Sequence, residues 1–280
     1  MKKNVLIIAT IVLAANLSNA QDMMSKKGTP ILPEVKDWSI GIDANPILEY
    51  FGNAFNHSDN VAPAWDFTTN PMVITGLMVK DANTAYRAKV RLGISSSKRV
   101  YKVNDDLSTA TPAATKDDEV KTTSRNIILG AGIQKNRGKG RLRGIYGAEA
   151  MIGFSGGKTE HTFANAMTAT NPTPSTNIPG ETSGSTSRTT KIKNGSGFMF
   201  GIRGFIGAEY FFAPKISVAG EFGWGPALNS TGEGEVTTES SSGASPSATV
   251  TTNSVKTGKV SSFSFDTDNN SGAIRISFYF

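Results

Sequence analysis

The chain has 280 residues, no cysteine, 29 glycines and a formal net charge of +6. The absence of cysteine excludes a disulfide scaffold, a zinc knuckle and a thiol nucleophile. Beyond the N-terminus there is no run of 18 or more apolar residues, which excludes a helical membrane span. The high glycine content disfavours a helical protein.

The N-terminus has the three regions of a secretory signal peptide. Lys2 and Lys3 supply the positive charge, residues 5–15 form an apolar run, and Ser18-Asn19-Ala20 supplies small residues for cleavage. The apolar run is too short for a membrane anchor. We therefore predict a signal peptide over 1–20 and a short periplasmic segment over 21–36. The mature chain keeps a net charge of +4, which is too mild to indicate a nucleic-acid partner.

The body of the chain alternates apolar and polar residues with a period of two, which predicts β-strands. The clearest case is the last segment, where Ile274, Ile276, Phe278 and Phe280 share one face. Met72–Lys80 is less regular, and its facing is unclear. The eight expected strands are 37–45, 72–80, 84–98, 125–134, 141–155, 197–212, 216–224 and 273–280.

The connections alternate between short and long. The short ones are 81–83, 135–140 and 213–215, and the long ones are roughly 46–71, 99–123, 156–196 and 225–270. Between 231 and 262, 15 of 32 residues are Ser or Thr, too polar to pack a core. This pattern predicts an all-β, up-and-down antiparallel transmembrane β-barrel over 37–280, with long polar extracellular loops and short periplasmic turns.

Two alternatives remain for the fold. An exported β-sandwich would also alternate, and the segment 252–265 could raise the strand count to ten. The apolar faces favour the membrane barrel, because they carry aromatic residues near both ends, as membrane interfaces require. At the turn end these are Trp38, Tyr86, Tyr210, Phe278 and Phe280; at the loop end they are Phe154, Phe198, Phe200 and Trp224.

An eight-stranded barrel is just wide enough for side chains to fill it. The polar faces of the strands then predict an interior ion network that closes the lumen, since buried charges are tolerated when they are paired. Residue counting places Arg143 level with Glu209, and Glu149 level with Arg203. The ten expected members are Asp43, Arg87, Lys89, Arg91, Arg143, Glu149, Arg203, Glu209, Glu221 and Arg275.

Three stretches carry a resemblance to known proteins: WSIGIDANP at 38–46, GAEYFFAPKISVAGEFGWG at 207–225, and the alternating aromatic end of the chain. With the signal peptide, they resemble the small outer-membrane β-barrel proteins of Gram-negative bacteria, namely the OmpA-type transmembrane barrel domains and the related outer membrane β-barrel proteins. The resemblance implies a location in the cell outer membrane. It also implies that Ile274, Ile276, Phe278 and Phe280 form a signal for the outer-membrane assembly machinery.

Catalytic and metal-binding patterns are weak. His57-Ser58-Asp59 is the only His/Ser/Asp cluster, and neighbours in a polar loop seldom hold a nucleophile and a base rigidly. His161 falls in another expected loop. Asp105-Asp106 and Asp117-Asp118-Glu119 lack calcium-loop spacing and indicate a solvated charge run. We expect no enzyme, no catalytic residue, no cofactor and no metal.

These features favour a structural or surface-interaction protein that acts through its loops. The alternatives are a narrow channel for small solutes and, further off, a barrel enzyme acting on outer-leaflet lipid. The expected partners are outer-membrane lipids, including anionic outer-leaflet lipid, which basic residues toward the loop end would attract. These residues are Lys98, Arg99, Lys102, Arg125, Lys158, Lys191, Lys193, Lys256 and Lys259.

Overall fold

The computed structural model describes residues 24–25, 27–44, 73–138, 140–267 and 273–280, and these form one antiparallel sheet of twelve strands. The predicted signal peptide, the expected loop 46–71 and His57 lie outside the described residues. No helix long and apolar enough to span a membrane occurs in the described part of the chain. The strands are β1 (Trp38–Asp43), β2 (Val73–Asp81), β3 (Thr84–Asn104), β4 (Thr115–Arg137), β5 (Leu142–Thr162), β6 (Ser187–Lys193), β7 (Gly197–Ala213), β8 (Ile216–Thr231), β9 (Glu235–Ser242), β10 (Thr249–Lys256), β11 (Val260–Thr267) and β12 (Ala273–Tyr279).

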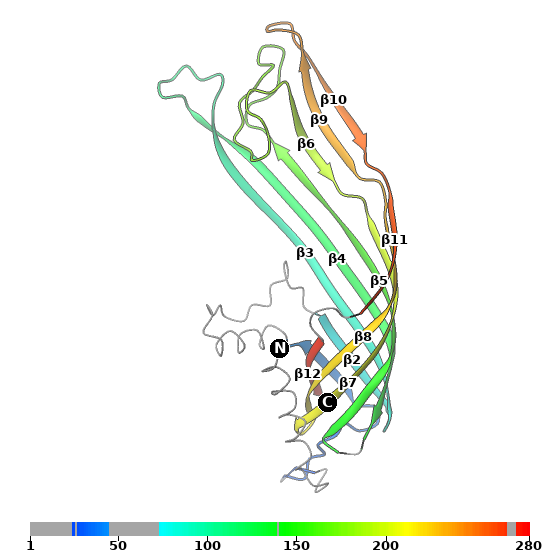
Figure 1. Cartoon of the computed structure of the whole chain (residues 1–280). Helices are drawn as coiled ribbons and strands as arrows, with labels where there is room; N and C mark the ends of the chain where they lie inside the picture. Colours follow the sequence, from blue (N-terminus) through cyan, green and yellow to red (C-terminus); the bar gives the residue numbers. More distant parts are fainter. Residues whose placement is uncertain (1–23, 26, 45–72, 139, 268–272) are drawn as a thin grey trace, which may run out of the picture.

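Eight of the strands close into a ring. In order they are β1, β2, β3, β4, β5, β7, β8 and β12, and β12 pairs back onto β1. The ring occupies the lower part of Figure 1, where the C-terminus lies. The expected eight strands are confirmed as this ring.

The remaining strands form a long open sheet above the ring, which we call the extension (Figure 1). It consists of the far halves of β3, β4 and β5, continued by β6, β9 and β10, with β11 alongside the end of β8. The expectation of long loops is therefore wrong for most of 99–123 and 225–270, and for the two ends of 156–196, whereas residues 163–186 lie outside any strand as expected. Strands with polar residues on both faces carry no apolar alternation, so their sequence does not reveal them.

Three chain passes are interrupted where the ring meets the extension, between β6 and β7, between β8 and β9, and between β10 and β11. The breaks lie side by side, because Gly195 comes against Gly232, and Gly234 exchanges hydrogen bonds with Thr257. A Cβ on Gly195 would collide with the carbonyl oxygen of Gly232, so this close approach requires glycine. Because β10, β11 and β12 follow one another in a single pass, the twelve strands make eight passes, and the described residues form a ring of eight strands rather than ten.

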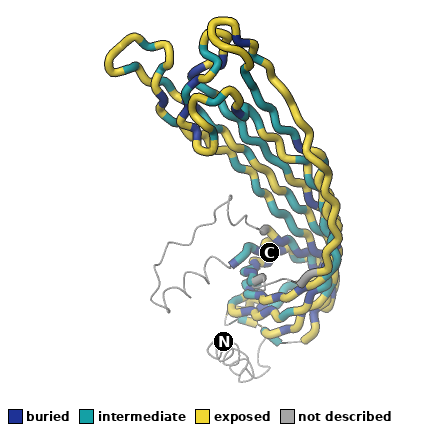
Figure 2. Tube along the Cα trace, turned by 45° about the horizontal axis from the view of Figure 1, so that its top comes forward, coloured by how far each residue is buried: buried dark blue, intermediate teal, exposed yellow. Residues whose placement is uncertain are grey.

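The ring strands reverse the polarity of a water-soluble protein, in which apolar side chains lie inside and polar ones outside. Buried and exposed residues alternate along the strands (Figure 2), with charged and hydroxyl side chains inside and apolar ones outside. In β2, whose facing the sequence leaves unclear, Leu77 and Val79 point inward and Ile74 outward. Exposed apolar residues of the ring include Trp38, Ile40, Tyr86, Ile133, Tyr146, Phe154, Phe198, Phe200, Ile202, Ile206, Phe222 and Trp224.

The turn end of the ring is closed by the segment that precedes β1. Ile31 is only 1% exposed and packs with Leu77, Phe211 and Tyr279. The turn residue Lys215 holds this segment through its own N–H, which donates to the Ile31 carbonyl, and through its ammonium, 2.8 Å from Asp37. The hydrogen bond to Asp37 raises the pKa of Lys215. A small apolar core therefore seals this end.

The far end of the extension carries its own small core. Residues 163–186, here called the distal cap, pack against it around Asp118, which is fully buried. The Asp118 carboxylate accepts hydrogen bonds from Ala164 N–H at 2.8 Å and from the Thr176 hydroxyl at 2.6 Å. The Arg188 guanidinium lies 4.0 Å from the centre of the Phe163 ring. The interpretation of Asp117-Asp118-Glu119 as a solvated charge run is thus wrong for Asp118.

We predict that Ile31→Ala lowers the free energy of unfolding by about 2–5 kcal/mol, because it leaves a cavity in the core that seals the ring. The matched control is Val35→Ala in the same segment, where the side chain is 56% exposed and the change should be within about 0.5 kcal/mol. Urea unfolding followed by tryptophan fluorescence measures both. Equal effects of the two substitutions would contradict the apolar core around Ile31.

Candidate functional site

The interior of the ring gathers the ionisable side chains expected there into two clusters. Of the ten expected members, eight form ion pairs with one another. The strand register sets Arg143 opposite Glu209 and Glu149 opposite Arg203, as residue counting predicts. The backbone register alone therefore places these opposite charges next to each other.

The central cluster is built on two carboxylates that several cations share. The carboxylate of Glu221 on β8 accepts hydrogen bonds from both terminal nitrogens of Arg87 on β3, at 2.6 and 2.7 Å. The Arg203 Nη1 atom on β7 lies 3.1 Å from Glu221 and 2.9 Å from Glu149. Lys89 lies 2.8 Å from Glu149 and 3.3 Å from Glu221. These contacts cross the interior, so they tie together strands that are not neighbours.

The second cluster lies nearer the turn end and centres on Glu209. Its Oε2 atom accepts two hydrogen bonds from Arg143, at 2.8 and 3.0 Å. Its Oε1 atom accepts from the Ser217 hydroxyl at 2.6 Å and from the Tyr279 hydroxyl at 2.9 Å. Arg143 also packs over the Phe211 ring. A fully buried carboxylate is tolerable here because both oxygens are satisfied.

Glycines on the inner face provide room for the large side chains. A Cβ on Gly41 would lie 2.8 Å from Cγ of Arg275, and one on Gly132 would lie 2.7 Å from Cβ of Glu149. On Gly223 it would collide with the guanidinium of Arg203. The glycines and the charges are thus complementary, because the interior of an eight-stranded ring has no room for a large side chain at every inward position.

A cavity of about 90 Å³ remains beside the central cluster, lined by Asp43, Lys89 and Arg275 among others. The Arg275 Nη1 atom lies 3.6 Å from Glu221, and its Nε donates to Ser277 at 3.0 Å. Asp43 lies opposite Arg275 in the register. Arg91 makes no ion pair with any described residue. The cavity has space for a few water molecules at most.

The chemistry open to this interior is electrostatic. The carboxylates Glu149, Glu209 and Glu221 are buried and paired with cations. His161, expected in a loop, lies in β5, with Nδ1 2.9 Å from the Thr189 carbonyl oxygen and 3.5 Å from Glu181. Asp105 pairs with Lys116, and no metal-binding group of His, Cys, Asp and Glu occurs among the described residues.

Sequence reasoning missed the neutral partners of the network. The hydroxyls of Ser217 and Tyr279 donate hydrogen bonds to Glu209. The Phe205 ring stacks against Arg87, with the guanidinium 4.4 Å from the ring centre. All three occupy inward positions of their strands, which is the signal that could have found them. Ile31 follows no such pattern, because it lies outside the strands.

No family model, curated protein or solved structure matches this chain significantly.

We predict that Glu221→Gln lowers the free energy of unfolding by about 3–5 kcal/mol, because Arg87, Lys89 and Arg203 would lose a shared buried counter-charge. The control is Glu233→Gln, whose partners Lys256 and Lys259 are exposed, and here the loss should stay below about 1 kcal/mol. Urea titration of the folded protein in detergent micelles measures both. A Glu221 variant as stable as the control would refute the network as a stabilising core.

Proposed function

We propose that this chain is an integral outer-membrane β-barrel protein with a filled interior, which anchors the extension at the cell surface as a structural or interaction element. The observation that carries the proposal is the inverted polarity of the ring. Its outward side chains are apolar, and its ionisable side chains are directed inward. A water-soluble protein rarely exposes so continuous an apolar surface, whereas a closed ring in lipid needs one.

The height of the apolar surface supports a membrane span. On β7 the outward residues from Tyr210 to Phe198 are twelve positions apart. At about 3.4 Å per residue and a tilt of roughly 40°, this corresponds to about 30 Å, close to the hydrocarbon thickness of a bilayer. Aromatic side chains mark both limits, with Trp38 and Tyr86 level with the turns and Phe154 and Phe198 at the start of the extension. These are the positions of the two interfacial belts.

The filled interior favours an anchor over a channel. The apolar core around Ile31 closes one end of the ring, and the two ion clusters occupy its middle. The extension then offers the surface available to partners, a polar sheet with two open edges. Among the described residues, β3 beyond Arg91 and β10 along its whole length pair with a strand on one side only. The location in the outer membrane and recognition of the β12 residues by the assembly machinery belong to the same proposal.

We expect Ile202→Lys to lower the stability of the protein folded in phosphatidylcholine vesicles by about 2–4 kcal/mol, because Ile202 lies at mid-height on the outer face. The control is Leu107→Lys at the tip between β3 and β4. Both side chains are exposed, 49% for Ile202 and 73% for Leu107, so water alone would tolerate both changes. Equal tolerance of the two lysines in urea titrations would argue against a membrane-spanning ring.

We expect the protein to give no steady conductance in planar bilayers bathed in molar KCl, because side chains fill the ring at two levels. Insertion is checked independently by protection of the ring from added protease. Reproducible steady currents from the inserted wild-type chain would favour the narrow-channel alternative.

A further inference from the structure

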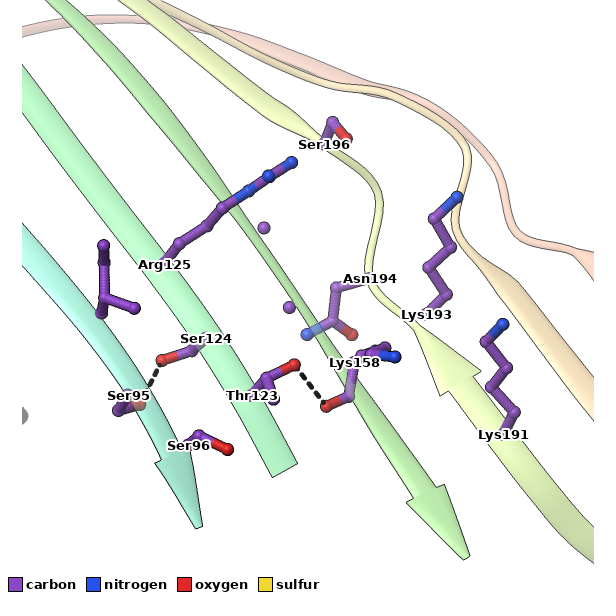
Figure 3. A pocket seen from close by; sticks show the side chains of 13 residues that line it. Ser95, Ser96, Thr123, Ser124, Arg125, Lys158, Lys191, Lys193, Asn194 and Ser196 are labelled. Carbon is purple, nitrogen blue, oxygen red and sulfur yellow. Dashed lines mark hydrogen bonds between the residues drawn. The ribbon is translucent and has the colours of Figure 1, made fainter. Parts of the chain in front are cut away.

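A depression of about 430 Å³ lies where the ring passes into the extension (Figure 3). β3, β4 and β5 cross it, and the break between β6 and β7 borders it. Its basic lining residues are Arg125, Lys158, Lys191 and Lys193, and its lining contains no carboxylate. We call these four residues the basic pocket.

Strand register places the basic pocket on the outer face of the sheet. Lys158 lies opposite Thr123 and Lys193, and it shares a side of β5 with the exposed Phe154. Residues directly opposite in an antiparallel pair share one face. The four cations therefore belong to the face that carries the apolar surface of the ring, and not to the interior.

On this outer face, residues that pair across neighbouring strands form rows, and these rows change from apolar to basic within a few residues along the strands. One row is apolar, with Leu92, Ile127, Phe154 and Phe198 side by side, and the last two rings lie 5.7 Å apart. The next outward row contains Arg125, and the row after that contains Lys158 and Lys193. At about 3.4 Å per residue the cations begin roughly 7 Å along the strand beyond the aromatic pair.

Positive charge exceeds negative charge around the basic pocket. Lys158 pairs with Glu160 at 2.8 Å, and Lys191 lies opposite Glu160 in the register. Glu235 lies opposite Lys193, and Arg125 forms no ion pair with any described residue. Four cations thus have two carboxylates beside them, and neither carboxylate lines the depression.

Gly156 lies in the floor of the depression and leaves room for the side chain of Arg125. A Cβ on Gly156 would lie 3.3 Å from Nε of Arg125, so the guanidinium lies across this residue. Arg125 and the lysines project from neighbouring strands around it (Figure 3), with the Thr123 hydroxyl between them. This arrangement combines a planar fork of donors with mobile ammonium groups, which suits phosphate oxygens.

We propose that the basic pocket binds the phosphate of a lipid headgroup whose acyl chains lie on the apolar row of Phe154 and Phe198. This inference rests on the proposed membrane location of the ring. Headgroup phosphates lie just outside the hydrocarbon region, at the level where the cations follow the aromatic pair. The apolar row favours a lipid over a free phosphate ion, because it offers acyl chains a surface that inorganic phosphate cannot use.

The test uses the full mature chain folded in phosphatidylcholine vesicles that contain a trace of spin-labelled phosphatidic acid or spin-labelled phosphatidylcholine. The measured quantity is the fraction of label immobilised by the protein. We expect the wild-type chain to prefer phosphatidic acid by about tenfold. The triple variant R125Q/K191Q/K193Q should lose most of this preference.

The matched control removes three positive charges elsewhere on the extension, in K102Q/K256Q/K259Q. Their side chains are exposed and lie outside the pocket lining. It should keep the lipid preference within about twofold. Equal losses in both triple variants would show a diffuse charge effect and overturn the pocket, as would no loss in either.

Two further outcomes separate the sources of failure. If millimolar inorganic phosphate displaces the labelled lipid, the site takes the free anion and the lipid assignment is wrong. If the wild-type chain inserts but shows no lipid preference, the pocket is wrong while the proposed function stands. A wild-type chain that inserts into no vesicle overturns the proposed function and this inference with it.

Discussion

The two carboxylates Glu149 and Glu221 hold the centre of the ring together. Between them they contact Arg87, Lys89 and Arg203, which come from strands on different sides of the interior. A narrow ring leaves no space for bulk water around such charges, so each cation depends on a shared carboxylate for its counter-charge. The inward glycines follow from the same constraint, because the arginines need the volume that other side chains would take.

Once the charges are inside, the outside must be apolar if the strands are to keep their alternation. The period of two fixes both faces at once, and a slip of one residue in register would move every arginine to the outer face. The ion network and the apolar exterior are therefore one property of the ring seen from two sides. The core around Ile31 seals the turn end. The breaks in the strands at Gly195 and Gly232 mark where the apolar exterior ends and the polar extension begins.

The parts of the fold that the sequence predicts are those where one face differs from the other. The ring strands alternate between large apolar residues and glycine or charge, so their existence, facing and level pairs such as Arg143 with Glu209 could be deduced. β9 and β10 are rich in Ser and Thr on both faces, so their pattern resembles a loop although the backbone pairs throughout. Asp118 and Ile31 were out of reach for another reason: each is buried by a segment distant in sequence, residues 163–186 in one case and the ring interior in the other.

The central claim is that the apolar exterior of the ring lies in the outer membrane, and its most direct test is a gel of outer-membrane fractions from cells that produce the chain. Closed rings of strands stabilised by backbone pairing resist unfolding by SDS until they are heated. We expect the chain in the outer-membrane fraction, and we expect it to migrate differently when unheated than when boiled. A chain found in the soluble periplasmic fraction, with the same migration before and after boiling, would contradict it.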